Sequence, residues 1–371
     1  MNTKILSVHH LRGIAAVFVV FFHFHSFLNG VYSQNKIGTL LFGSGAFGVD
    51  LFFLISGFII ALATSKPVKP SVFLIRRFFR IYPLFLIMFI MGFILVYKDI
   101  SALDFMRSIL FIHKDYNQAS PGFGYNVLGP AWTLSYEVYF YSVFLISMLL
   151  SHKNRIVITS FIILTPLVIS QLLFNGEISL SATASPAIPA GIPMHDLIRF
   201  TGSPILIEFV LGMMFYSYYV SNRVLLSKTN AKIFLLITSS AFLALYFTSE
   251  EKRFGLTCFG AWSILLFSGC IVYDKSIGFK DVKILSFLGD ISFSLYLSHY
   301  IVIKYLESSK PTWWWDSFGI TKFILASLIC FTIATLVHYF IEKPFIRYGK
   351  KLEYLVKTGA EPILRPPSAL S

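Results

Sequence analysis

Long apolar stretches recur along the whole chain and restrict it to one class of fold. A helix needs about 20 predominantly apolar residues to cross the hydrocarbon core of a bilayer. Of the 371 residues, 56% are hydrophobic and 13% are charged, and the mean hydropathy is +0.72. We therefore expect an all-α, polytopic integral membrane bundle of about ten transmembrane helices. The expected spans are residues 9–28, 46–65, 81–97, 131–150, 156–174, 197–219, 233–248, 255–273, 286–306 and 321–341.

The basic residues predict how this bundle is oriented. About two thirds of the 31 Lys and Arg residues fall in segments that share one side of the membrane with the N-terminus. The positive-inside rule then places both termini in the cytoplasm. The net charge of +13 therefore reflects the orientation of the protein in the membrane. Because the charge is explained in this way, we expect no nucleic-acid partner. The expected organisation is a transmembrane domain over residues 1–348 and a cytoplasmic tail over 349–371, disordered at its end.

The first span carries two ionisable residues, Arg12 and His23. Eleven residues make about three helical turns, so the two side chains share one face and lie about 16 Å apart along the axis. Either group is costly to hold in hydrocarbon, and a plain lipid anchor carries neither. The pair therefore indicates a pathway or a reaction inside the membrane.

Ionisable residues on four spans fall in one layer near the outer surface. Hydrocarbon cannot hold two carboxylates, so these groups must face one another or a water-filled cavity. His25 lies about 200° around the helix from His23, so the two cannot share a metal, and we expect no metal site. Counting residues from the outer ends of the spans gives depths of about 6–10 Å for four side chains, which are those of His23, Asp50, Glu137 and His299.

An arginine cluster stands on the opposite, cytoplasmic side. Arg76, Arg77 and Arg80 lead into the third span, and Arg12 lies at a similar depth. Guanidinium groups bind phosphate through paired, charge-assisted hydrogen bonds, so the cluster suits a phosphate-bearing ligand. Anchoring by the positive-inside rule explains the same residues, and the sequence leaves both interpretations open.

Two long segments between spans, residues 98–130 and 175–196, are rich in turn-forming residues. They are either lids over an outward-facing site or simple connectors. The three cysteines, Cys258, Cys270 and Cys330, lie in apolar stretches without paired spacing, which argues against a disulfide or metal role.

Several blocks of the chain, in order and in register, resemble the membrane-bound acyltransferase-3 family of bacteria. The first is a basic residue followed after ten spacers by histidine, here Arg12 and His23. One block departs mildly, because Thr133 stands where the family has Ser and keeps the hydroxyl. The resemblance runs from Leu11 to about Arg347. Its blocks are residues 11–16 with His23, 48–58, 77–83, 132–137, 289–299 and 341–344.

The resemblance implies a membrane O-acyltransferase of the bacterial inner membrane. In that family an acyl group, most often acetyl, moves from cytoplasmic acyl-CoA to a hydroxyl of a surface or lipid-linked glycan such as O-antigen or exopolysaccharide. Acetyl-CoA is then the donor and co-substrate without a metal, and the partners are acyl-CoA, a glycan or lipid-linked saccharide acceptor, and membrane lipids.

The expected roles follow from chemistry and from the matched blocks. His23 is the expected general base, and Asp50 or Glu137 would orient its imidazole. The resemblance assigns acyl-CoA binding to Arg12, Arg77 and Arg80, and acceptor binding to Ser292, Tyr296 and His299.

Three other functions remain open. Intramembrane carboxylates, histidine and arginine also suit a proton-coupled secondary transporter. An acyltransferase could act on a small molecule or a peptidoglycan sugar. A structural subunit of a glycan export complex is the third.

Overall fold

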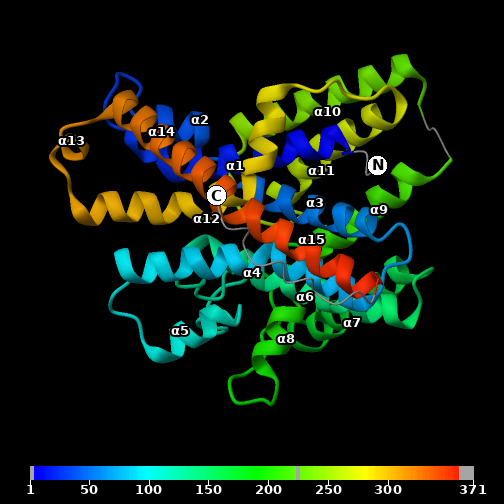
Figure 1. Cartoon of the computed structure of the whole chain (residues 1–371). Coiled ribbons are helices and arrows are strands. Elements are labelled where there is room, and N and C mark those ends of the chain that lie inside the picture. Colours follow the sequence, from blue (N-terminus) through cyan, green and yellow to red (C-terminus); the bar gives the residue numbers. More distant parts are fainter. Residues whose placement is uncertain (1–3, 223–225, 359–371) are drawn as a thin grey trace, which may run out of the picture.

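The computed structural model describes residues 4–222 and 226–358, and this part of the chain is almost entirely helical (Figure 1). Over these ranges no residue belongs to a named strand, and the one antiparallel bridge joins Ser181 to Gly255. Short helices and turns connect the long helices. They are α2 (Ile37–Phe42), α5 (Ala102–Ile109), α8 (His195–Thr201), α13 (Thr312–Trp315), the 3₁₀ helices η1 (His25–Leu28) and η2 (Gly129–Ala131) and the π-helix η3 (His338–Glu342).

Each of the ten expected spans coincides with a helix. Within the described ranges, eight helical segments are long and apolar enough to cross a membrane, or up to nine if α8 and α9, which bend by 41°, count as one. The expected all-α, multi-span membrane fold is thus confirmed. The ten helices are α1 (Leu6–Phe24), α3 (Phe47–Ala63), α4 (Pro70–Leu95), α6 (Trp132–Leu150), α7 (Arg155–Asn175), α9 (Leu206–Val220), α10 (Lys228–Thr248), α11 (Phe259–Ser276), α12 (Lys283–Ser309) and α14 (Gly319–Val337).

The helix α11 is not among the candidate spans. Its 18 residues end with the charged pair Asp274 and Lys275, which lowers its mean hydropathy. The side of the membrane on which the termini lie stays a prediction.

The helix α4 begins earlier than the sequence suggests. It starts at Pro70 rather than near residue 81, so the arginine cluster lies inside the helix and not before it. Proline is favoured in the first turn of a helix, where its missing N–H has no partner to lose. Arg77 and Arg80 therefore share a face of α4, one turn apart.

The bundle is centred on α3, which packs against α1, α9 and α11. At the α3–α9 crossing two glycines allow backbone contact. A Cβ atom at Gly57 would lie 2.1 Å from the Phe209 carbonyl oxygen, and one at Gly212 would lie 2.1 Å from that of Leu54. Small residues of this kind bring membrane helices close together. The crossing fixes α3, whose other face lines the site described below.

The helix α15 (Lys343–Thr358) follows α14 through η3 and packs against α4. It runs without a break across residue 348, where we expected the membrane domain to end. Residues 359–371, which include the expected disordered end, lie outside the described residues.

Candidate active site

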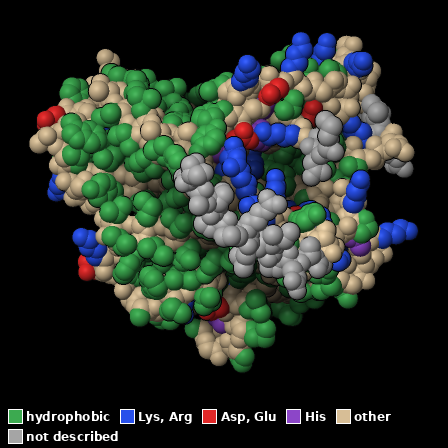
Figure 2. Space-filling view, in the orientation of Figure 1, with side chains coloured by type: hydrophobic (Ala, Val, Ile, Leu, Met, Phe, Trp, Pro, Cys, Tyr) green, Lys and Arg blue, Asp and Glu red, His purple; other side chains and the backbone are tan. Residues whose placement is uncertain are grey.

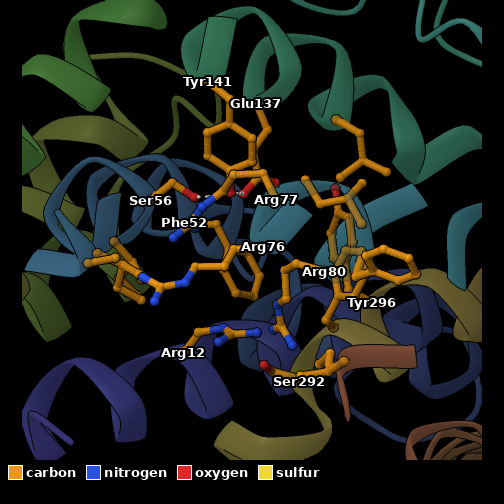
Figure 3. Close-up of a pocket in the computed structure, with 18 of the residues that line it drawn as sticks. Arg12, Phe52, Ser56, Arg76, Arg77, Arg80, Glu137, Tyr141, Ser292 and Tyr296 are labelled. Carbon is orange, nitrogen blue, oxygen red and sulfur yellow. Dashed lines mark hydrogen bonds between the residues drawn. The ribbon is translucent and has the colours of Figure 1, made fainter. Parts of the chain in front are cut away.

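A cavity of about 560 Å³ lies between α1, α3, α4, α6, α12 and α15 (Figure 3). Its walls are mainly apolar, with Phe52, Phe53 and Ile59 from α3. Figure 2 shows Lys and Arg side chains near the centre of one face, next to a broad area of hydrophobic side chains on the left. We call this space the arginine cavity after the cations that line it, which are Arg12, Arg76, Arg77, Arg80 and Lys350.

Two of these arginines have carboxylate partners. The Arg76 guanidinium donates two hydrogen bonds to Glu353 of α15, at 2.8 Å from Nε and 2.5 Å from Nη2. Arg80 donates to Glu342, whose side chain is 1% exposed and also contacts Ser294 and His338. These two ion pairs attach α4 to the C-terminal end of the chain.

Arg12 and Arg77 differ, because no described carboxylate lies within 4.0 Å of either guanidinium. The Arg77 guanidinium lies over the rings of Phe73 and Tyr141, 5.6 and 5.2 Å from their centroids. Its buried Nε has no hydrogen-bond partner in the described part of the chain. Neither arginine is therefore in an ion pair within the described ranges, although Glu137 lines the same cavity and interacts electrostatically with Arg12. Guanidinium groups of this kind are able to bind an anionic ligand.

Glu137 lines the arginine cavity and not the surroundings of His23. The Tyr141 hydroxyl donates to Glu137 Oε1, and Ser56 Oγ lies 3.4 Å from the same oxygen. The carboxylate is therefore held one helical turn from Tyr141, facing the cationic side chains (Figure 3).

A second cavity, of about 650 Å³, contains His23. It lies between α1, the beginning of α6, α12 and the segment that follows α4. We call it the histidine cavity. Its polar and aromatic lining comes mostly from residues 97–132, and includes Tyr97, Asp99, Lys114, Tyr125, Asn126 and Trp132, with Tyr300 from α12.

The segment 98–130 is packed against the bundle. His113 within it is fully buried against the rings of Tyr116, Phe123 and Tyr136. Burial lowers the pKa of His113 to about 3, so the ring packs as a neutral aromatic group. Of the two interpretations of this segment, covering a site fits better than a simple connector, because it forms one wall of the histidine cavity.

His23 and His299 lie side by side, with ring centroids 5.1 Å apart. His299 Nδ1 is 3.0 Å from the Leu295 carbonyl oxygen, which can only accept, so this nitrogen donates. Its buried Nε2 has no partner among the residues that the structure describes. His25 instead stacks on Phe22 in η1, and its Nδ1 contacts the Phe22 carbonyl oxygen at 2.5 Å.

Asp50 faces away from both cavities. The structure places it, fully buried, against Glu208 of α9, and its Oδ1 accepts a hydrogen bond from the Gly255 backbone N–H at 2.6 Å. Neither carboxylate oxygen of Glu208 has a hydrogen-bond partner in residues 4–222 and 226–358. Sequence reasoning missed Glu208, although an acidic residue within an expected span is a detectable signal.

The structure thus divides the expected site residues between neighbouring regions. Arg12, Arg77, Arg80, Glu137 and Ser292 line the arginine cavity, whereas His23 lines the histidine cavity with His299 beside it. Tyr296 lines both, as does Val49 of α3. Arg76, which the sequence places in the arginine cluster, also lines the arginine cavity. Sequence reasoning missed Lys350 and Glu353, which line this cavity from α15. No group of three or more His, Cys, Asp or Glu side chains with metal-binding geometry occurs in the described part.

Comparison with known proteins shows the family to which the chain belongs. The profile of the acyltransferase domain family matches residues 5–341, and the chain belongs to the acyltransferase-3 family. It is similar to the exopolysaccharide production protein ExoZ of Rhizobium meliloti (strain 1021), with 25% identity over 317 residues, covering 83% of this chain and 92% of ExoZ. It is also similar to the acyltransferase MdmB of Streptomyces mycarofaciens, with 26% identity over 375 residues, covering 91% of this chain and 90% of MdmB. No solved structure matches significantly.

Proposed function

We propose that this membrane acyltransferase moves an acyl group, most often acetyl, from cytoplasmic acyl-CoA to a hydroxyl of a surface or lipid-linked glycan. The observation that carries the proposal is that the arginine cavity adjoins the histidine cavity inside one bundle, since Val49 and Tyr296 line both. Arg12 lines one and His23 the other, and the two residues lie about 16 Å apart along α1.

The arginine cavity supports a CoA thioester as donor. Arg12 and Arg77 lack carboxylate partners in the described ranges, and guanidinium groups bind phosphate oxygens in pairs. Arg80 would contribute charge beside them while it holds Glu342. With its phosphates there, the extended arm of the donor would bring the thioester towards His23.

His23 would act as the general base. It would take the proton from the acceptor hydroxyl while the oxygen attacks the thioester carbonyl. The C–O bond forms, the C–S bond breaks, and the proton passes to the leaving thiolate, which gives free CoA and an ester. His299, beside it, would hold the ring in place of the two expected carboxylates, because Asp50 packs against Glu208 and Glu137 lines the arginine cavity.

The acceptor would enter the histidine cavity. Its side chains combine aromatic surfaces, such as Trp132 and Tyr125, with polar groups such as Asp99 and Asn126. Sugars present apolar faces and hydroxyl edges, and this mixture complements both. The similarity to a protein named for exopolysaccharide production supports a glycan acceptor.

The proposal places the protein in the bacterial inner membrane with both termini in the cytoplasm. Exposed positions test this orientation, because the natural cysteines Cys258, Cys270 and Cys330 are buried. A cysteine at the exposed Ala119, in the segment between α4 and α6, should react with an impermeant reagent in intact cells. One at Ser65, beside the arginine cavity, should react only after lysis. The reverse pattern would contradict the orientation.

Transfer itself is tested in inside-out membrane vesicles that carry the natural acceptor. Vesicles containing the protein should form O-acyl esters on membrane glycan and release CoA in equal amounts, only when acyl-CoA is added. Vesicles without the protein provide the control. Transport of a solute across the vesicle membrane that does not depend on acyl-CoA, without ester formation, would instead favour a secondary transporter.

A further inference from the structure

Few side chains separate the two cavities. Val49 of α3 and Tyr296 of α12 line both of them. The Phe52 ring meets the Tyr296 ring edge-on, with centroids 5.6 Å apart. Val49 and Tyr296 are each only 6% exposed, so little free surface remains between them. A group that passes from one cavity to the other must move past these two side chains.

The Tyr296 hydroxyl connects the boundary between the two cavities to the beginning of α6 by hydrogen bonds. It donates a hydrogen bond to the Pro130 carbonyl oxygen at 2.9 Å and lies 3.0 Å from Thr133 Oγ1. Pro130 lines the histidine cavity and Thr133 the arginine cavity. The hydrogen bonds therefore hold the Tyr296 ring at the boundary between the two cavities.

We propose that Val49 and Tyr296 form a gate that selects the acyl group of the donor by its width. The inference rests on the proposed function, in which the acyl end leads the thioester from the arginine cavity to His23. A straight acyl chain has the same cross-section whatever its length. A methyl branch beside the carbonyl makes the leading end wider.

The histidine cavity is roomy and the gate is narrow, so the width of an acyl group, and not its length, would decide whether it passes. The histidine cavity, about 650 Å³, has room for a few extra methylene groups beyond the reacting carbonyl. The gate has no such room, because both of its side chains are tightly packed. Apolar enzyme pockets discriminate about 10- to 200-fold for one methylene group. The gate therefore admits short straight acyl groups and disfavours branched ones.

Competition between two isomeric donors tests this inference. Butyryl-CoA and isobutyryl-CoA have the same composition and differ only in branching, and deuterium in the butyryl group separates the products by mass. Inside-out vesicles with the full chain and the natural acceptor receive both donors at equal concentration, and mass spectrometry of the glycan gives the ester ratio. We expect at least about a tenfold preference for butyryl, from the range for one methylene group.

Variants of the gate should change this ratio in opposite directions. Val49→Ala widens the passage and should lower the preference about tenfold, the lower end of the same range. Val49→Ile narrows it and should raise the preference. Tyr296→Phe keeps the ring but removes the hydrogen bonds to Pro130 and Thr133, and should lower the preference by a smaller factor.

Matched controls come from buried residues that line neither cavity. Val210→Ala on α9 and Tyr246→Phe on α10, whose hydroxyl donates to the Leu41 carbonyl oxygen at 2.8 Å, should keep the natural ratio. Equal use of the two isomers by the natural protein would overturn the gate, as would one ratio shared by both Val49 variants. If acetyl-CoA also gives no ester in any vesicle, the proposed function itself fails.

Discussion

The arginine cavity and the histidine cavity share α1, α3, α6 and α12 and differ in chemistry. Along α1, Arg12 lines the first and His23 the second, and along α12 the corresponding residues are Ser292 and Tyr300. The first cavity presents fixed cations within apolar walls. The second presents an imidazole next to another imidazole, with aromatic and polar side chains from residues 97–132.

The difference shows how one bundle can separate binding from chemistry. A guanidinium keeps its charge at any physiological pH, which suits holding phosphate and not moving protons. An imidazole exchanges a proton near neutral pH and suits general-base catalysis. The comparison therefore predicts different consequences for substitutions in the two cavities.

The largest effect is expected from His23. Loss of a positioned general base lowers rates by about 10²–10⁴-fold. His23→Ala should therefore abolish glycan acylation, and His23→Gln should not restore it, because Gln cannot take up the proton. NMR of O-acetyl groups on the glycan, at matched protein levels, gives the measurement. His25→Ala is the control, and near-normal acetylation in His23→Ala would shift the assignment to His299.

The next largest effect is a loss of folding stability when Arg80 of the arginine cavity is replaced. Arg80→Ala leaves the buried Glu342 without its arginine and with only Ser294 and His338 as contacts, and removing one partner of a buried ion pair lowers stability by about 3–5 kcal/mol. Unfolding in detergent should show this loss. The control is Arg76→Ala, whose more exposed partner Glu353 keeps Lys357, so its loss should be smaller. Equal losses would mean that the Arg80 pair has no special structural role.

Arg77 separates donor binding from stability. Arg77→Ala removes no ion pair, and should weaken acyl-CoA binding by about 1.5–3 kcal/mol, the range for hydrogen bonds to charged groups. Arg77→Lys should restore binding only in part, because a point charge lacks the planar fork. Titration of the purified protein with acyl-CoA gives the affinity. Arg253→Ala removes one positive charge at an exposed position outside the arginine cavity and is the control. Unchanged acyl-CoA affinity in Arg77→Ala would mean that Arg77 serves only to anchor the helix in the membrane.

The smallest effect is expected at Asp50. An amide resembles a protonated carboxyl, so Asp50→Asn preserves the packing against Glu208 and should lower the rate less than about tenfold. A carboxylate that orients a catalytic imidazole behaves differently, since its amide variant loses about 10⁴-fold. The rate of acyl transfer with saturating donor decides between these roles. A loss of rate of about 10⁴-fold in Asp50→Asn would show instead that Asp50 orients the catalytic imidazole.

The sequence predicted the fold well because hydropathy measures the length of each membrane helix directly. Arg12 and His23 were placed correctly on one face, since helical periodicity fixes their relation within α1. The beginning of α4 was misplaced, because its arginines masked the helical pattern, although Pro70 marks the first turn.

Relations between helices could not be read from depth alone. Asp50, Glu137 and His23 have similar depths, yet Asp50 turns to Glu208 and Glu137 turns to the arginine cavity. Depth specifies a layer, whereas the rotation of each helix decides which neighbours its side chains meet. Only the packed structure places His299 beside His23.

The central claim is that one donor molecule extends through both cavities. A structure of the protein with a non-hydrolysable acetyl-CoA thioether analogue tests it most directly. The account predicts phosphates in contact with Arg12 and Arg77, the arm between Val49 and Tyr296, and the acetyl carbon next to His23. An analogue bound outside the arginine cavity, or one whose acetyl end stays on that side of Tyr296, would contradict the account.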